Sequence, residues 1–158
     1  MDLKLVYALI LTVMPITELR VGMPVAIVYA VENNVPLYLM FGLIVLLNIL
    51  LILFIFFFLD NLHKFFMKIS LYKKFFEFCF KRIRRKIENF NKNYKTIGFF
   101  ALVLFVAIPL PGTGAWTGCL VSWVLGLERK KSILSIALGV LIAGTIIFLA
   151  SLGFMEIF

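Results

Sequence analysis

The sequence has few charged side chains, one histidine and two cysteines. Charged residues make up 15% of its 158 positions, against about 25% in typical soluble domains. With His63 as the single histidine, and Cys79 and Cys119 far apart, the chain offers neither a cluster of metal ligands nor a disulfide framework. It also lacks the serine–histidine and paired-aspartate arrangements of hydrolases. We therefore expect no enzyme activity, no metal and no cofactor.

Apolar residues are correspondingly abundant in the chain. They account for 63% of the chain, whereas soluble domains contain about 45–50%. They gather in four blocks, at 5–31, 36–59, 97–127 and 132–155. Stretches of about 20 apolar residues are typical of segments surrounded by lipid. The sequence therefore predicts an all-α integral membrane protein.

Two of the blocks are uninterrupted. Pro36–Leu59 and Ser132–Met155 contain no charged residue, and as helices each is about 36 Å long, enough to cross a bilayer core of about 30 Å. The second carries Ser135, Gly139 and Ala143 at a spacing of four, which lets another helix approach closely. Packing within this subunit is favoured over a dimer contact.

The other two blocks are broken in the middle. Leu5–Ile16 and Val21–Val31 flank one break, and Ile97–Ile108 and Ala115–Leu127 flank the other. Each arm, as a helix, is about 17–20 Å long, or roughly half the bilayer. Proline and glycine at each break interrupt the helical hydrogen bonds. Each block is therefore either a long kinked span or a re-entrant hairpin whose tip lies near the middle of the membrane.

The distribution of positive charge bears on this choice. The segment 60–95 contains eleven Lys and Arg against three acids, which equals the net charge of +8 of the whole chain. We expect this segment and Arg129–Lys131 to be cytoplasmic, because cytoplasmic loops are enriched in Lys and Arg. Residues 97–127 would then enter and leave on the same side, as a re-entrant hairpin does. Whether residues 5–31 span the membrane or re-enter is left open.

If both broken blocks re-enter, the chain is a single membrane domain, 1–158, built from two inverted repeats. Each repeat, 1–59 and 96–158, is a re-entrant helical hairpin plus one transmembrane helix, an arrangement known in transporters. The connector 60–95 has apolar residues at steps of three and four among basic ones. It is predicted to be a basic amphipathic helix bound to anionic lipid headgroups. A partner-binding or coiled-coil helix is the alternative, and nucleic acid is not the expected partner.

The candidate site lies at the two breaks. Glu18 and Arg20 are the charged residues well inside an apolar block, where a charge is costly and is by default functional or tightly paired. An extended tip after Pro15 would let both point into one cavity; otherwise each has a partner of its own. If the two tips meet, both approach the Pro109–Gly114 loop, where Gly112, Thr113 and Gly114 precede a helix whose N-terminus favours anions. Glu18 could also carry protons, or it could simply tie the two hairpins together.

Two motifs carry a resemblance to a known family. The segment Pro15–Pro24 (PITELRVGMP) and the segment Pro109–Gly118 (PLPGTGAWTG) together resemble the putative small multidrug export protein family. That family in turn resembles, distantly, the DedA/VTT membrane proteins. The resemblance implies paired re-entrant loops, inverted repeats, and transport or lipid translocation. It brings Pro24, Pro109 and Pro111 into the substrate- or proton-binding site beside the residues above.

The expected function is therefore that of a secondary transporter or lipid translocator in the cell membrane, with several membrane passes, a midplane site and coupling to protons through Glu18. The charges around Arg20 fit an anion or a phospholipid headgroup better than a cation. The alternative is a non-transporting membrane scaffold or assembly protein. One subunit with two full spans offers little wall around a pathway, so a homodimer is a candidate assembly, and the oligomeric state is left open.

Overall fold

The computed structural model describes residues 3–66, 94–110 and 112–157, and within these ranges all regular secondary structure is helical. The helices are α1 (Leu3–Val13), α2 (Glu18–Glu32), α3 (Leu37–Phe66), α5 (Tyr94–Ala107), α6 (Ala115–Val124) and α7 (Arg129–Ile157). The predicted all-α class is confirmed. Most of the expected amphipathic connector, residues 67–93, lies outside the described residues, and its first part, 60–66, continues α3.

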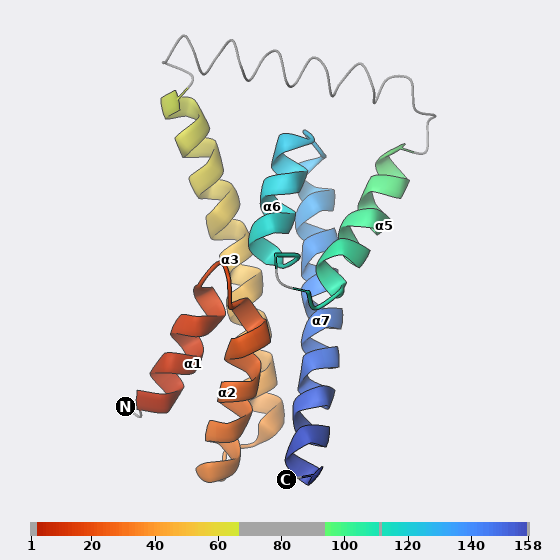
Figure 1. Cartoon of the computed structure of the whole chain (residues 1–158). Helices are drawn as coiled ribbons and strands as arrows, with labels where there is room; N and C mark the ends of the chain where they lie inside the picture. The colour runs from red at the N-terminus through yellow and green to blue at the C-terminus, as the bar shows by residue number, and fades with distance from the viewer. Residues whose placement is uncertain (1–2, 67–93, 111, 158) are drawn as a thin grey trace.

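Among the described residues, two helices are long and apolar enough to cross a membrane. They cover Leu37–Asn61 of α3 and Arg129–Phe154 of α7, close to the two spans expected at 36–59 and 132–155. With 30 and 29 residues, α3 and α7 are each about 45 Å long. They run in opposite directions along the middle of the molecule (Figure 1).

The remaining described helices form two antiparallel hairpins, α1 with α2 and α5 with α6. Their arms have 10 to 15 residues, about 15–23 Å, so each is roughly half as long as α3 or α7. Each hairpin starts and finishes at the same end of the molecule, and its turn lies about halfway along the long helices (Figure 1). At the open end of the first hairpin, Lys4 Nζ lies 2.7 Å from a Glu32 carboxylate oxygen.

The core lies where α2, α3 and α7 pack together, with α1 on the outside of α2 and α5 on the outside of α7 (Figure 1). Met23, Ile27, Ile44 and Ile136 are fully buried there. Large apolar side chains also cover the outer surface, including Leu46, Leu50, Leu53, Phe54, Phe57 and Phe58 of α3. An outer surface of this kind is typical of helices whose solvent is lipid.

Small residues let α5 approach α6 and α7 closely. A Cβ added to Gly118 would lie 2.8 Å from Val106 Cγ2, and one added to Gly139 would lie 2.6 Å from Val106 Cβ. Val106 of α5 therefore occupies the space left by one glycine on each neighbouring helix. Ser135 and Ala143, the other members of the small-residue row in α7, are buried within the chain as well. This is the packing within the subunit that the sequence favoured.

Candidate functional site

Glu18 is the link between the two hairpins. It is the first residue of α2, and its side chain is only 2% exposed. Its carboxylate accepts a hydrogen bond from the backbone N–H of Ala115 (3.1 Å, to Oε2) and another from that of Trp116 (3.0 Å, to Oε1). Ala115 and Trp116 open α6, in the other hairpin. Glu18 therefore caps a helix that begins 97 residues further along the chain.

The start of α6 is built to receive this carboxylate. The N-cap residue, Gly114, has no side chain that could cap the helix, which leaves the first N–H groups of α6 open. A Cβ on Gly114 would lie only 1.4 Å from Glu18 Oε2, so glycine is required for the carboxylate to approach. The negative charge also complements the positive end of the helix dipole. Glu18 itself has φ +45°, a backbone cost of about 1–3 kcal/mol that the two hydrogen bonds offset.

Two details of the sequence interpretation change here. The glycine-rich turn 112–114 does precede a helix N-terminus that holds an anion, but the anion is the chain's own Glu18. The tip is also not extended, because Thr17 has helical dihedral angles and α2 begins at Glu18. Of the two alternatives, the structure follows the second: Glu18 and Arg20 each have a partner of their own in the second hairpin.

Arg20 makes the second polar contact between the hairpins. Its Nη2 donates to Thr113 Oγ1 at 2.8 Å. The same hydroxyl lies 2.6 Å from the carbonyl oxygen of Ile108 and 2.9 Å from that of Leu110, either of which can accept its hydrogen. Both carbonyls follow the end of α5. Arg20 therefore contacts a hydroxyl that also bonds to carbonyls of the turn between α5 and α6.

The end of α1 is satisfied in a similar way. Pro15 has no N–H to give to the carbonyl of Leu11, four residues earlier, and the hydroxyl of Thr17 donates to this carbonyl instead, at 2.6 Å. The indole N–H of Trp116, from α6, donates to the carbonyl of Val13 at 3.0 Å. Each hairpin thus supplies hydrogen-bond partners for the open helix ends of the other.

The other predicted site residues lie around this meeting point. Pro24 and Pro109 line, together with Arg20, a groove of about 470 Å³ between α2 and the second half of α7. Gly112 is exposed, with φ +85°, in the turn before α6. Pro111 lies outside the described residues. The structure thus gathers Glu18, Arg20, Thr113 and Gly114 into one contact and places the two described prolines beside it.

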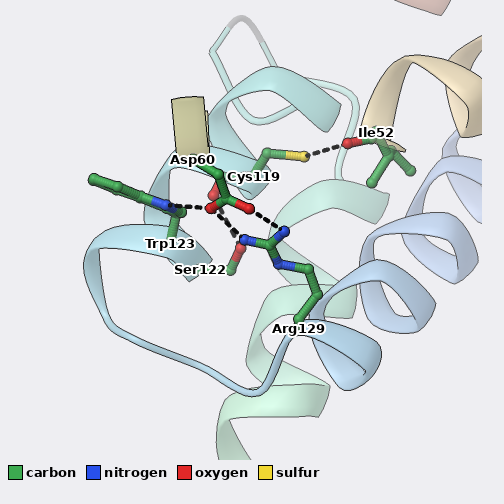
Figure 2. Close-up of polar contacts among 6 residues, drawn as sticks. All are labelled: Ile52, Asp60, Cys119, Ser122, Trp123 and Arg129. Atoms are coloured by element: carbon green, nitrogen blue, oxygen red, sulfur yellow. Dashed lines mark hydrogen bonds and ion pairs between the residues drawn. The ribbon is translucent and has the colours of Figure 1, made fainter. Parts of the chain in front are cut away.

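A second polar cluster joins α3, α6 and α7 at the end of the molecule where α7 begins (Figure 2). The carboxylate of Asp60 accepts two hydrogen bonds from the guanidinium of Arg129, at 2.5 and 2.6 Å. It also accepts one from the indole N–H of Trp123, at 3.4 Å. Arg129 in addition lies 4.9 Å from the ring centroid of Phe56. The pairing of Asp60 with Arg129 has no local signal in the sequence, because 69 positions separate the two partners.

Metal ligands are not gathered anywhere in the part of the chain that the structure describes, since no three His, Cys, Asp or Glu side chains lie close enough to share an ion. Cys119 is a free, buried thiol whose Sγ lies 4.0 Å from the carbonyl oxygen of Ile52 (Figure 2). The chemistry available at the candidate site is therefore that of one carboxylate, one guanidinium and open helix ends.

Comparison with known proteins bears on both hairpins. A search of curated proteins and a search of solved structures find no match. The family model described as putative small multi-drug export protein matches residues 18–146, a range that starts at Glu18 and includes Arg20, the second turn and Asp60. Together with the two long apolar helices, this match indicates a location in a membrane. The chain belongs to the putative small multi-drug export protein family.

Proposed function

We propose that this protein is a proton-coupled membrane transporter whose two hairpins re-enter the bilayer and meet at its middle. The observation that carries the proposal is the pair of hydrogen bonds from the N-terminus of α6 to Glu18, a buried carboxylate that joins two largely apolar hairpins. The export function in the family's name supports the transport class.

The half-length arms support re-entry. An arm of about 15–23 Å is too short to cross a bilayer core of about 30 Å. The opposite directions of α3 and α7, each following a hairpin in the chain, fit two inverted repeats. Lys130 and Lys131 follow Arg129 at one end, and the positive-inside rule makes that end cytoplasmic. The more distant resemblance to DedA/VTT proteins, and with it lipid translocation, stays a prediction.

Protonation of Glu18 is the proposed coupling step. A neutral carboxyl group forms weaker hydrogen bonds than a carboxylate, by roughly half, and it loses its attraction to the dipole of α6. A proton on Glu18 would therefore loosen the contact between the hairpins beside the groove that Arg20 lines. Loss of the proton would restore the contact, which gives two states that differ by one proton.

The Asp60–Arg129 pair is the proposed closure of the cytoplasmic end. It ties α3 of the first repeat to α7 of the second, whereas the groove lies along the opposite half of α7. In this conformation the path would be closed to the cytoplasm and accessible from the other half of the membrane. A disulfide between Asp60→Cys and Arg129→Cys is expected to stop transport, and reduction is expected to restore it.

The test is flux in proteoliposomes under an imposed pH gradient. The probes are carboxyfluorescein as an anion, ethidium as a cation and a fluorescent phosphatidylglycerol whose translocation is followed by dithionite quenching. We expect pH-driven movement of at least one probe, lost in Glu18→Gln and retained in Glu32→Gln, a matched change at the other end of α2. Size-exclusion profiles would check that both variants fold.

Two results would count against transport. If the wild-type protein moves none of the three probes, the scaffold alternative is favoured, since the Glu18 contact would then be purely structural. If Glu18→Gln folds and moves the probes as fast as the wild-type protein, the coupling role of Glu18 is wrong.

A further inference from the structure

The groove beside Arg20 combines one positive charge with apolar walls. It is lined by Arg20 and Val28 of α2, by Pro109, and by the second half of α7, including Ala150, Ser151 and Phe154. Arg20 is the only charged residue among these. Ser151 Oγ donates to the carbonyl of Ile147 within its own helix, so the serine hydrogen is already used. The site thus offers a guanidinium at one point and hydrocarbon elsewhere.

The size and shape of the groove limit what can occupy it. Its volume of about 470 Å³ falls within the range of pockets that hold drug-sized molecules. Arg20 and Val28 are eight residues apart on α2, so the groove extends about 12 Å along the helix axis between these two positions. A ligand that fills it has a compact polar head and an apolar body of about that length.

The charge of Arg20 determines the sign of the head group. The acid nearest to it in the chain, Glu18, is engaged by the N–H groups of α6, whose positive dipole end already balances part of its charge. Thr113 accepts one of the five N–H donors of the guanidinium. A guanidinium binds carboxylate, sulfonate and phosphate groups through parallel hydrogen bonds, and these are strengthened where water is excluded.

From these observations we infer that the groove binds a small amphipathic anion, with its head on Arg20 and its apolar body between α2 and α7. The occupant is a single molecule with a free carboxylate, sulfonate or phosphate, not a bilayer phospholipid. This inference rests on the proposed function for its role, as the substrate class of the transporter, but binding itself does not require transport.

Binding is measurable without flux. The protein would be placed in nanodiscs of phosphatidylcholine and titrated with 11-(dansylamino)undecanoate, whose emission reports transfer to an apolar site. A dansylated undecylammonium of the same length is the matched cation. We expect saturable binding of the anion, and binding of the cation at least about tenfold weaker. Arg20→Gln is expected to weaken anion binding by about tenfold or more, while Arg20→Lys retains part of it.

A second pair of variants tests the apolar part of the groove. Ala150→Phe would fill it without touching Arg20 and is expected to abolish anion binding. Ala101→Phe, on the exposed side of α5, adds the same ring elsewhere and is expected to leave binding unchanged. These variants keep the test valid if the Arg20 variants fold poorly.

Three outcomes would overturn the inference. They are equal binding of anion and cation, anion affinity unaffected by Arg20→Gln in folded protein, and displacement of the probe by phosphatidylglycerol within the nanodisc, which would make a bilayer lipid the occupant. Failure of transport is a separate result: selective binding with no flux leaves the groove assignment intact, and flux without selective binding removes only the substrate class.

Discussion

Replacing Gly114 by alanine tests the contact between the hairpins most directly. The added Cβ would lie 1.4 Å from Glu18 Oε2, 2.3 Å from Cδ and 2.6 Å from Oε1. No rotation of a carboxylate about its own axis relieves three contacts of this kind. Gly114 is also the N-cap of α6, so the helix start cannot move without losing its own geometry. Glu18 would therefore have to leave the α6 N-terminus.

The expected cost follows from what Glu18 loses. It gives up two hydrogen bonds to a charged group, each worth about 1.5–3 kcal/mol. The free energy of unfolding is therefore expected to fall by about 3 kcal/mol or more. That is a large part of the total stability of a typical protein, which is about 5–15 kcal/mol.

The buried thiol of Cys119 provides the assay. In a Cys79→Ser background it is the only cysteine, and it is fully buried, so its rate of reaction with a maleimide reports how often the helices open. A loss of about 3 kcal/mol corresponds to a rate increase of about 100-fold. Gly42→Ala is the matched control, because a Cβ there meets nothing within 4 Å. It is expected to leave the rate unchanged or to slow it, since alanine favours helix by about 1 kcal/mol.

A double-mutant cycle decides whether the clash involves Glu18. If it does, Glu18→Ala and Gly114→Ala are expected to be strongly non-additive, because removing the carboxylate removes the atom that Cβ would meet. The combined variant should then be little worse than Glu18→Ala alone. Additive effects of the two changes, or a Gly114→Ala variant as stable as Gly42→Ala, would refute the contact.

Three further predictions concern helix packing and topology. Gly22→Ala would place a Cβ 2.0 Å from Thr12 Oγ1. It is expected to destabilise the first hairpin, measured with the same thiol assay. Thr12→Ala should restore only part of the lost stability, because the backbone carbonyl oxygen of Ala8 also lies 3.0 Å from the added Cβ. Gly139→Ala would press against α5 and is expected to lower the free energy of unfolding by about 1–3 kcal/mol, measured in the same way. A membrane-impermeant maleimide is expected to label Lys130→Cys and Asn33→Cys from opposite sides of the membrane, and labelling from one side would contradict the proposed orientation.

The all-α class and the two long apolar helices were predictable because they depend on length and polarity. For uncharged runs as long as 36–59 and 132–155, a spanning helix is the expected conformation in lipid, because it pairs every backbone N–H and C=O within the segment. The interruption of the helix at Pro15 was also predictable, since proline leaves the carbonyl of Leu11 without its helical hydrogen-bond donor. What misled was the conformation after the proline. Thr17 pairs that carbonyl, which lets α2 start at Glu18, so the tip is not extended.

The contacts within the candidate site were only partly predictable. The sequence predicted that Glu18 and Arg20 approach the turn of the second hairpin, because charged side chains in lipid need partners. It could not assign Glu18 to the N–H groups of α6, since backbone donors carry no residue type that a sequence displays. The same holds for the carbonyl of Val13, which is the partner of Trp116. Interactions of side chains with distant backbone are therefore visible only in the folded chain.

Under the proposed function, the mutual capping of the hairpins would link protonation at position 18 to their movement. In lipid, an unpaired backbone N–H costs several kcal/mol. If Glu18 moved away without a replacement, the N–H groups at the start of α6 would be left unpaired at that cost. The hairpins can separate only if water or a bound anion takes over the two N–H groups that Glu18 leaves. The groove that begins at Arg20 lies beside these groups and could admit either one. Opening of the contact, protonation of Glu18 and occupation of the groove are therefore expected to depend on one another, which is the coupling that a transporter requires.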